Sequence, residues 1–139
     1  MITSLRIVRS GLPSRRIIRS AVDAYQVLRP LARGRDREHF WRLDLDSRRR
    51  LIGCELVSVG SLDASIAHPR EIFKGALLNN AHRVMVAHNH PSQDVMPSAE
   101  DRATTKRLLL AGFLLGVELS DHLILADDRY FSFKEARLL

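Results

Sequence analysis

The chain has 139 residues, of which 45% are hydrophobic and 27% charged, and it contains one cysteine. This length suits one well-packed domain, and the apolar runs are too short to cross a membrane. A single cysteine excludes an internal disulfide and a cysteine-rich zinc site, and the N-terminus lacks the apolar segment of a secretory signal. We therefore expect one globular domain in the reducing cytoplasm, with no membrane partner.

The net charge of +6 is concentrated in the first part of the chain. Residues 1–50 contain 13 arginines and 5 acidic residues, whereas residues 51–139 contain 9 basic and 11 acidic residues. An Arg-rich half is what a surface that contacts phosphate groups needs, and it is equally typical of a solvated basic face. Contact with DNA through this half therefore stays open.

The N-terminal region predicts a short strand, a helix and a loop. Residues 2–9 are compatible with the strand, and residues 30–37 read as a basic loop. Between them, apolar residues recur at helical spacing from Ser14 onward, and Pro30 is expected to stop this helix. The apolar positions are Ile17, Ile18, Ala21, Val22, Tyr25 and Leu28.

The next two segments predict a β-hairpin. The first strand runs from Glu38 to Leu45, and the second from Leu51 to Val59. A turn at residues 46–48 joins them. Alternate residues of the first strand form one apolar face, which consists of Trp41, Leu43 and Leu45.

A second helix and a central strand follow. The helix opens at His68 and Pro69, because proline is favoured at the first helical position. Its expected buried stripe consists of Ile72, Phe73, Ala76 and Leu77. The apolar run at residues 83–88 lies between two helices, a pattern typical of a strand buried on both faces.

The last part of the chain predicts a third helix and two strands. The helix spans Ser98 to Leu115 and ends at Gly116 as its C-cap, and the strands are expected at residues 122–126 and 130–133. The resulting order of elements favours an α/β fold, a single domain whose mixed β-sheet is flanked by helices.

The segment HNHPSQDVMPSAED, residues 88–101, has the spacing of a metal site. His88 and His90 stand two residues apart at the end of a strand, so both imidazoles point to the same side of the sheet. Asp101 is a third potential ligand for zinc, which needs three protein ligands when its fourth position stays open. Asp101 can also serve only as a cap, because Ser98 and Asp101 have the spacing of a capping box.

This pattern resembles the motif of the JAMM metalloenzymes and, in its surroundings, their RadC-like branch. The similar segments are HPREIFKGALLNNA at 68–81, HNHPS at 88–92 and DHLIL at 121–125. Gln93 departs from the branch, which more often has glycine there. The resemblance implies a JAB/MPN domain of cytidine-deaminase-like architecture over residues 1–139, with a basic part at 1–32 and a motif-bearing core at 33–133.

The resemblance also implies roles for single residues. A Zn²⁺ ion would be held by His88, His90 and Asp101, and an upstream glutamate would act as the general base. Glu38 stands at the position of the family's glutamate, and Glu55 is the alternative. Ser98 would stabilise the oxyanion of the transition state, with or without capping its helix.

Three functions follow from these residues. The first is a zinc-dependent metallopeptidase or isopeptidase, a hydrolase whose substrate is a peptide or isopeptide. The second is a DNA-associated, repair-linked module without peptidase activity. The third, an inactive relative kept for protein contacts, is disfavoured by the intact set of ligands. A zinc-dependent nucleic-acid deaminase is excluded, since it needs two cysteines. The oligomeric state stays open.

Other residues have simpler interpretations. His122 and Asp121 are either outer partners of the metal ligands or ordinary buried residues, and the second interpretation is favoured. Cys54 and Trp41 are expected in the core.

Overall fold

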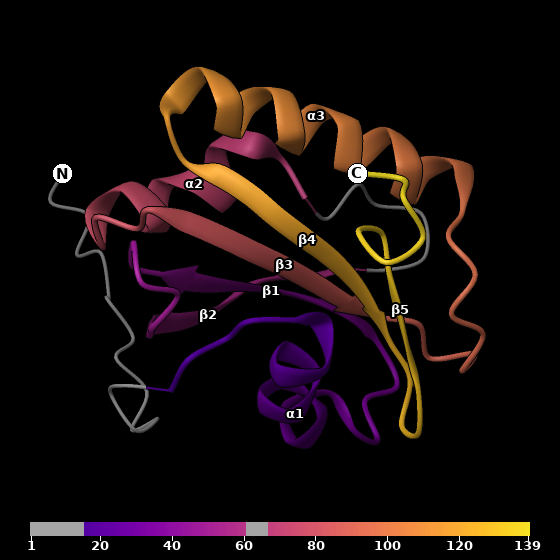
Figure 1. Ribbon diagram of the computed structural model, residues 1–139. Coiled ribbons are helices and arrows are strands. Elements are labelled where there is room, and N and C mark those ends of the chain that lie inside the picture. Colours follow the sequence, from indigo (N-terminus) through magenta and orange to yellow (C-terminus); the bar gives the residue numbers. More distant parts are fainter. Residues whose placement is uncertain (1–15, 61–66) are drawn as a thin grey trace, which may run out of the picture.

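The computed structural model describes residues 16–60 and 67–139. Within them, one mixed five-stranded sheet is flanked by three helices, which confirms the predicted α/β fold (Figure 1). The helices are α1 (Ala21–Ala32), α2 (Pro69–Leu78) and α3 (Ala99–Leu115). The strands are β1 (Glu38–Leu45), β2 (Leu51–Gly60), β3 (Arg83–Asn89), β4 (Glu118–Leu125) and β5 (Tyr130–Ser132). No helix of this described part is long and apolar enough to span a membrane.

The sheet has the strand order β2-β1-β3-β4-β5, with β3 at its centre as predicted. β3 and β4 are parallel and are joined through α3, whereas the other neighbours are antiparallel. Helix α1 covers one face of the sheet, and α2 and α3 cover the other (Figure 1). The face under α1 carries the predicted apolar residues Trp41, Leu43 and Leu45 in one buried cluster.

The first helix differs from its prediction at both ends. Residues 16–18 are extended, because they pair with residues 49–51 through an Ile18 N–H bond to the Arg49 carbonyl and a Leu51 N–H bond to the Arg16 carbonyl. The helix therefore begins only at Ala21. It also includes Pro30, which was expected to stop it. Because Pro30 lies in the last turn, its missing N–H costs the helix one bond and the helix continues for only two residues. The strand predicted at residues 2–9 lies outside the described residues.

Helix α2 buries a different stripe from the predicted one. Ile72, Phe73 and Ala76 are buried, but Leu77 is 48% exposed and Gly75 is buried in its place. Gly75 packs against the buried guanidinium of Arg42, where a Cβ atom would lie 2.6 Å from Nη2. The apolar pattern could not show that a buried arginine occupies this side of the helix.

Strand β4 begins at Glu118, four residues before the prediction. The buried Ser120 and Asp121 interrupt its apolar pattern. Asp121 is satisfied inside the fold, since its carboxylate accepts from the Ser132 hydroxyl at 2.5 Å and from the Lys134 N–H at 3.0 Å. The other strand ends lie within one residue of their predicted positions.

Candidate metal centre

Four potential metal ligands meet where β3 ends. Glu38 opens β1, His88 lies near the end of β3, His90 follows that strand, and Asp101 lies in the first turn of α3. His88 Nε2 is 3.1 Å from Asp101 Oδ1 and 3.6 Å from Glu38 Oε1, and His90 Nε2 is 3.2 Å from Asp101 Oδ2. One ligand atom from each residue lies within 4.8 Å of the others, so the group could hold a metal ion.

Asp101 caps its helix and also faces the histidines. The Ser98 hydroxyl accepts from the Asp101 N–H at 3.0 Å, and Asp101 Oδ2 accepts from the Ser98 N–H at 2.9 Å. Both bonds of the capping box are present, and they orient the carboxylate. Burial opposes ionisation of the Asp101 carboxyl, but its close contacts with the His88 and His90 rings hold its pKa far below the usual range. Asp101 can therefore both cap its helix and face the candidate metal site, the two roles that its spacing predicted.

A chain of hydrogen bonds determines which ring nitrogen of His88 is free. Thr105 Oγ1 donates to the Asp101 carbonyl at 2.8 Å, so this hydroxyl accepts in its 2.6 Å contact with His122 Nδ1. Burial lowers the pKa of His122 well below its ordinary value, so its ring is neutral and Nε2 carries no hydrogen. His122 Nε2 then accepts from His88 Nδ1 at 2.8 Å. The unprotonated nitrogen of His88 is thus Nε2, the atom that faces the other ligands.

His90 has the same orientation for a simpler reason. Its Nδ1 lies 2.7 Å from the Asp94 carbonyl oxygen, which can only accept a hydrogen bond. In the neutral ring Nδ1 therefore carries the hydrogen, and Nε2 is left as a lone pair toward His88 and Asp101. Two imidazole lone pairs and two carboxylates converging on one point form a donor set suited to zinc.

Glu38 is held at the centre by Asn89. The buried Asn89 side chain accepts from the His39 N–H at 2.6 Å and donates to the Arg37 carbonyl at 2.9 Å, so it binds the backbone on both sides of Glu38. Burial raises the pKa of Glu38, and the nearby His88 lowers it only in part. A carboxylate with a raised pKa is better matched to accept and return a proton near neutral pH.

Glu55, the alternative base, lies elsewhere. It pairs with Arg42 Nη1 at 3.3 Å, and Arg42 also binds Asp44 through Nε at 2.6 Å. Because Arg42 is buried, Glu55 helps to neutralise a charge inside the fold. The structure therefore brings Glu38, and not Glu55, to His88, His90 and Asp101.

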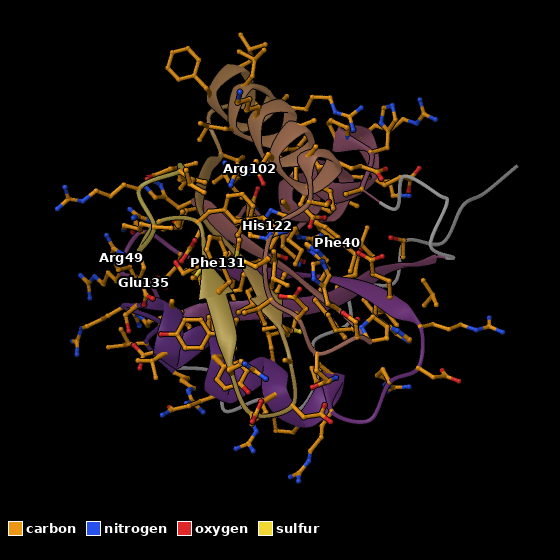
Figure 2. All side chains as sticks on the ribbon, turned by 90° about the vertical axis from the view of Figure 1, so that its right-hand side faces the viewer. Phe40, Arg49, Arg102, His122, Phe131 and Glu135 are labelled. Atoms are coloured by element: carbon orange, nitrogen blue, oxygen red, sulfur yellow. The ribbon has the colours of Figure 1, made fainter. Side chains whose placement is uncertain are left out.

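The ligands form the floor of a pocket of about 1060 Å³. Ser98 lines this pocket, and its hydroxyl hydrogen is free to donate, because the oxygen accepts from Asp101. The lining of this pocket also includes two further acidic residues, Asp36 and Glu100, and the basic Arg37. Figure 2 looks onto this end of the sheet, where His122 and Phe40 lie between α3 and the strands. The Phe40 ring stacks on His88 at a centroid distance of 5.8 Å.

The family description "RadC-like JAB domain" matches residues 18–138. The chain belongs to this family. The UPF0758 protein of Methanococcoides burtonii is 47% identical over 121 residues, which cover 87% of this chain and 53% of that protein. The UPF0758 protein of Desulfitobacterium hafniense strain DCB-2 is 42% identical over 134 residues, which cover 96% of this chain and 59% of that protein. This RadC-like JAB domain thus spans about half the length of the curated relatives it matches, and their names state no activity.

The sequence did not predict the contacts that three residues of this RadC-like JAB domain make at the candidate metal centre. His122 was considered mainly a core residue, and it is buried, but it also bonds His88. Thr105 stands four residues after Asp101, so the helical repeat places both on one face, a signal that was available. Asn89 follows His88 in β3, so its side chain points to the other face of the sheet. Nothing in its position in the sequence predicted its hydrogen bonds to the backbone of residues 37 and 39.

Gln93 adopts a backbone conformation that favours glycine. Its φ of 69° lies in the left-handed region, where a side chain is strained and glycine is not. In this RadC-like JAB domain the side chain is also used, since Gln93 Oε1 accepts from the Asp127 N–H at 2.7 Å. This bond ties the loop after His90 to the β4–β5 turn.

Proposed function

We propose that this domain is a zinc-dependent hydrolase that cleaves an amide bond of a peptide or isopeptide. The observation that carries the proposal is the convergence of Glu38, His88, His90 and Asp101 on the floor of a pocket, with both imidazoles presenting Nε2. Two histidines and a carboxylate leave a coordination position open on tetrahedral zinc. The resemblance to JAMM metalloenzymes supports the same ligands.

The roles of the chain's own residues follow from their positions. When bound, zinc would polarise a carbonyl group and lower the pKa of water to about 7. Glu38 would take the proton of the attacking water and deliver it to the leaving nitrogen, because its carboxylate lies beside the ligands and is raised in pKa by burial. The free hydroxyl hydrogen of Ser98 would donate to the developing oxyanion.

Metal content and turnover test the proposal together. We expect about one zinc per chain by elemental analysis, and hydrolysis of some members of a panel of peptides and lysine isopeptides. A chelator should abolish this activity, and added zinc should restore it. His88→Ala should lose the metal and stay folded by circular dichroism, because most of the core lies away from the site. Stoichiometric zinc in that variant would overturn the ligand assignment, and zinc without turnover on any substrate would leave a metal-binding domain that is not a hydrolase.

A second candidate function, DNA contact, is favoured by a basic cluster at the opposite end of the sheet. The pairing of residues 16–18 with 49–51 brings Arg16 and Arg19 beside the Arg48–Arg50 turn, which follows the far end of β1. Arg15 lies outside the described residues. The acidic pocket itself is unsuited to a phosphate backbone. Binding of duplex DNA, measured by fluorescence anisotropy, should weaken steeply as salt rises. An absence of binding at low salt would rule out this function.

A further inference from the structure

The start of α1 borders a small basic pocket on the face of the sheet that this helix covers. The lining of the pocket includes Arg19, Ser20, Arg49, Ser120 and Lys134, and we call these five residues the α1 pocket. Ser120 lies near the start of β4, whereas the metal ligands lie where β3 ends and α3 begins. The α1 pocket is therefore at the end of the sheet opposite the metal centre.

The hydroxyl of Ser120 is buried and has no hydrogen-bond partner among the described residues. The residue is only 7% exposed, and it lines the pocket at a shift in the pairing of β3 with β4. Val84 of β3 pairs with Leu119, and Met85 pairs with the residue two positions further along β4. Ser120 is thus an extra residue without a partner in β3, as in a β-bulge. A buried hydroxyl that lacks a partner destabilises the fold, so it points to a partner from outside the chain.

Three cationic residues of the α1 pocket also lack a partner. The side chains of Arg19, Arg49 and Lys134 make no ion pair or hydrogen bond with any residue that the structure describes. Arg49 is half-buried, so water screens its charge less than that of a fully exposed arginine. Figure 2 shows Arg49 on the same side of the molecule as Glu135, the residue after Lys134. Unpaired cations beside an unpaired hydroxyl form a set of donors suited to an anion.

The first turn of α1 adds further donors. Its N-cap residue, Ser20, makes no capping bond through its side chain. The backbone N–H groups at the start of this 12-residue helix are therefore available at the pocket. The positive end of the helix dipole favours an anion at the same place.

The carboxylates near the pocket already have donors of their own. Asp121 also lines the pocket, and it accepts from the Ser132 hydroxyl at 2.5 Å and from the Lys134 N–H at 3.0 Å. Asp23 accepts from the Arg19 N–H at 2.9 Å and lies outside the lining. Three unpaired cations against one satisfied carboxylate leave the α1 pocket positively charged.

We propose that the α1 pocket binds a phosphate group. Its inner space of about 20 Å³ fits one group of the size of water. One phosphate oxygen would enter this space and accept from the Ser120 hydroxyl, and the other oxygens would meet Arg19, Arg49 and Lys134 at the mouth. A water molecule in the same space would satisfy the hydroxyl but would leave the three cations unpaired.

Titration with inorganic phosphate, followed by amide chemical shifts in NMR, tests the pocket. The signals of Ser20 and Ser120 should move as phosphate rises and should saturate, whereas sodium chloride at the same ionic strength should leave them unchanged. His88→Ala should give the same curve, because the metal centre lies at the opposite end of the sheet. An absence of saturation at tens of millimolar phosphate, or equal changes with chloride, would overturn the proposal.

Two arginines of one turn provide matched variants. Arg49→Gln should raise the phosphate dissociation constant about tenfold or more, because it removes a charged donor that lines the pocket. Arg48→Gln removes the same charge from an exposed neighbour outside the lining, and it should change this constant by less than about twofold. Equal effects would show a response to net charge alone and would contradict the site.

Ser120→Ala separates phosphate binding from stability. Without phosphate, the variant should be at least as stable as wild type in urea unfolding, since it removes a buried hydroxyl that lacks a partner. Its phosphate dissociation constant should nevertheless rise about fivefold. Unchanged affinity would show that the hydroxyl does not contact the phosphate, and the proposal would fail.

The phosphate group can belong to DNA or to a small phosphorylated molecule, and duplex binding distinguishes the two sources. If a DNA phosphate enters the pocket, Ser120→Ala should weaken duplex binding in fluorescence anisotropy, although the variant keeps the net charge. Duplex binding that is equal in Ser120→Ala and wild type, or absent in both, would assign the pocket to a small phosphorylated molecule. The phosphate titration depends on neither the hydrolase nor the DNA-contact function, so each of the three proposals can fail alone.

Discussion

At the scale of single residues, the centre depends on side chains that determine which atoms the ligands present. His122 and Thr105 place the hydrogen of His88 on Nδ1, and Asn89 holds the backbone around Glu38. Each of these partners is buried, and each satisfies its own polar atoms through the contact. The protein itself therefore orients the side chains that would hold the proposed zinc ion.

Glu38→Gln should separate proton transfer from metal binding. An amide has the same volume and can still hydrogen-bond water, so zinc content and fold should be unchanged. It cannot accept a proton, and turnover of a substrate found in the peptide panel should fall by about 10²-fold or more. Glu100→Gln is the matched control, since Glu100 lines the same pocket outside the ligand group. An equal loss in both variants would argue against Glu38 as the base.

Thr105→Val should weaken metal binding without touching a ligand. The valine keeps the shape of the side chain but leaves His122 Nδ1 without an acceptor, so the hydrogen on His88 is no longer fixed. We expect the zinc dissociation constant, measured by competition with a chelator, to rise about 10- to 100-fold. Thr105→Ser keeps the hydroxyl and should restore affinity. Wild-type affinity in Thr105→Val would show that the hydrogen-bond chain does not orient His88.

At the scale of elements, the start of α3 joins helix capping to ligand placement. The same carboxylate accepts from the N-cap N–H and contacts both histidines. The parallel pair of β3 and β4 supplies the other side of the centre, since the His90 N–H donates to the Leu125 carbonyl at 3.0 Å. The start of α3 and the β3–β4 pair therefore each position residues at the candidate metal centre.

Two alanine variants distinguish the roles of this helix start. Ser98→Ala removes one bond of the capping box and should lower the free energy of unfolding of the metal-free protein by about 1 kcal/mol. Asp101→Ala removes the other bond of the capping box and also the contacts with His88 and His90, so it should lower this free energy by more. Only Asp101→Ala should lose zinc, because Ser98 is not a ligand. Urea unfolding and elemental analysis measure the two effects. Loss of zinc in Ser98→Ala would mean that the cap is required to hold the carboxylate in place.

The elements and the proximity of His88, His90 and Asp101 were predictable from local pattern, and the contacts between distant segments, including those of Glu38, were not. The HNHP and Ser-x-x-Asp spacings lie within 14 residues of sequence, so strand and helix periodicity suffice to bring them together. The predicted burial of Leu77 was wrong, because the buried Arg42 of β1 packs against Gly75 of α2. The start of β4 was missed because its buried Asp121 is satisfied by β5 and the residues after it.

At the scale of the whole molecule, the two ends of the sheet differ in charge. The carboxyl end of β3 carries the acidic pocket, and the hairpin turn at the opposite end carries the basic cluster. This polarity would suit a neutral or cationic group at the acidic end and an anion at the basic end. It also means that the proposed hydrolase and DNA-binding functions do not compete for one surface.

The stability of the metal-free protein should depend on pH through His122. Because burial keeps the folded-state pKa of His122 well below its unfolded value, its stabilising contribution is present above about pH 6.5 and falls as pH drops below that value. His90 acts in the opposite direction: burial lowers its pKa, but bonds with Asp101 and the Asp94 carbonyl raise it overall. Urea unfolding between pH 7.5 and 5.5 should therefore show a smaller loss of stability in His122→Gln than in wild type. Equal losses would contradict this role.

The separation of the ligands along the chain has a consequence for how the protein is made. Glu38 and Asp101 lie 63 residues apart, and His122 follows another 21 residues later. Contacts of such high sequence separation form late in folding, because the chain must first close long loops. A nascent polypeptide therefore cannot assemble the centre until residues 38–122 have left the ribosome. The proposed zinc ion would then bind a domain that is already largely folded, so zinc shortage during growth should yield a folded, empty domain that later zinc can fill.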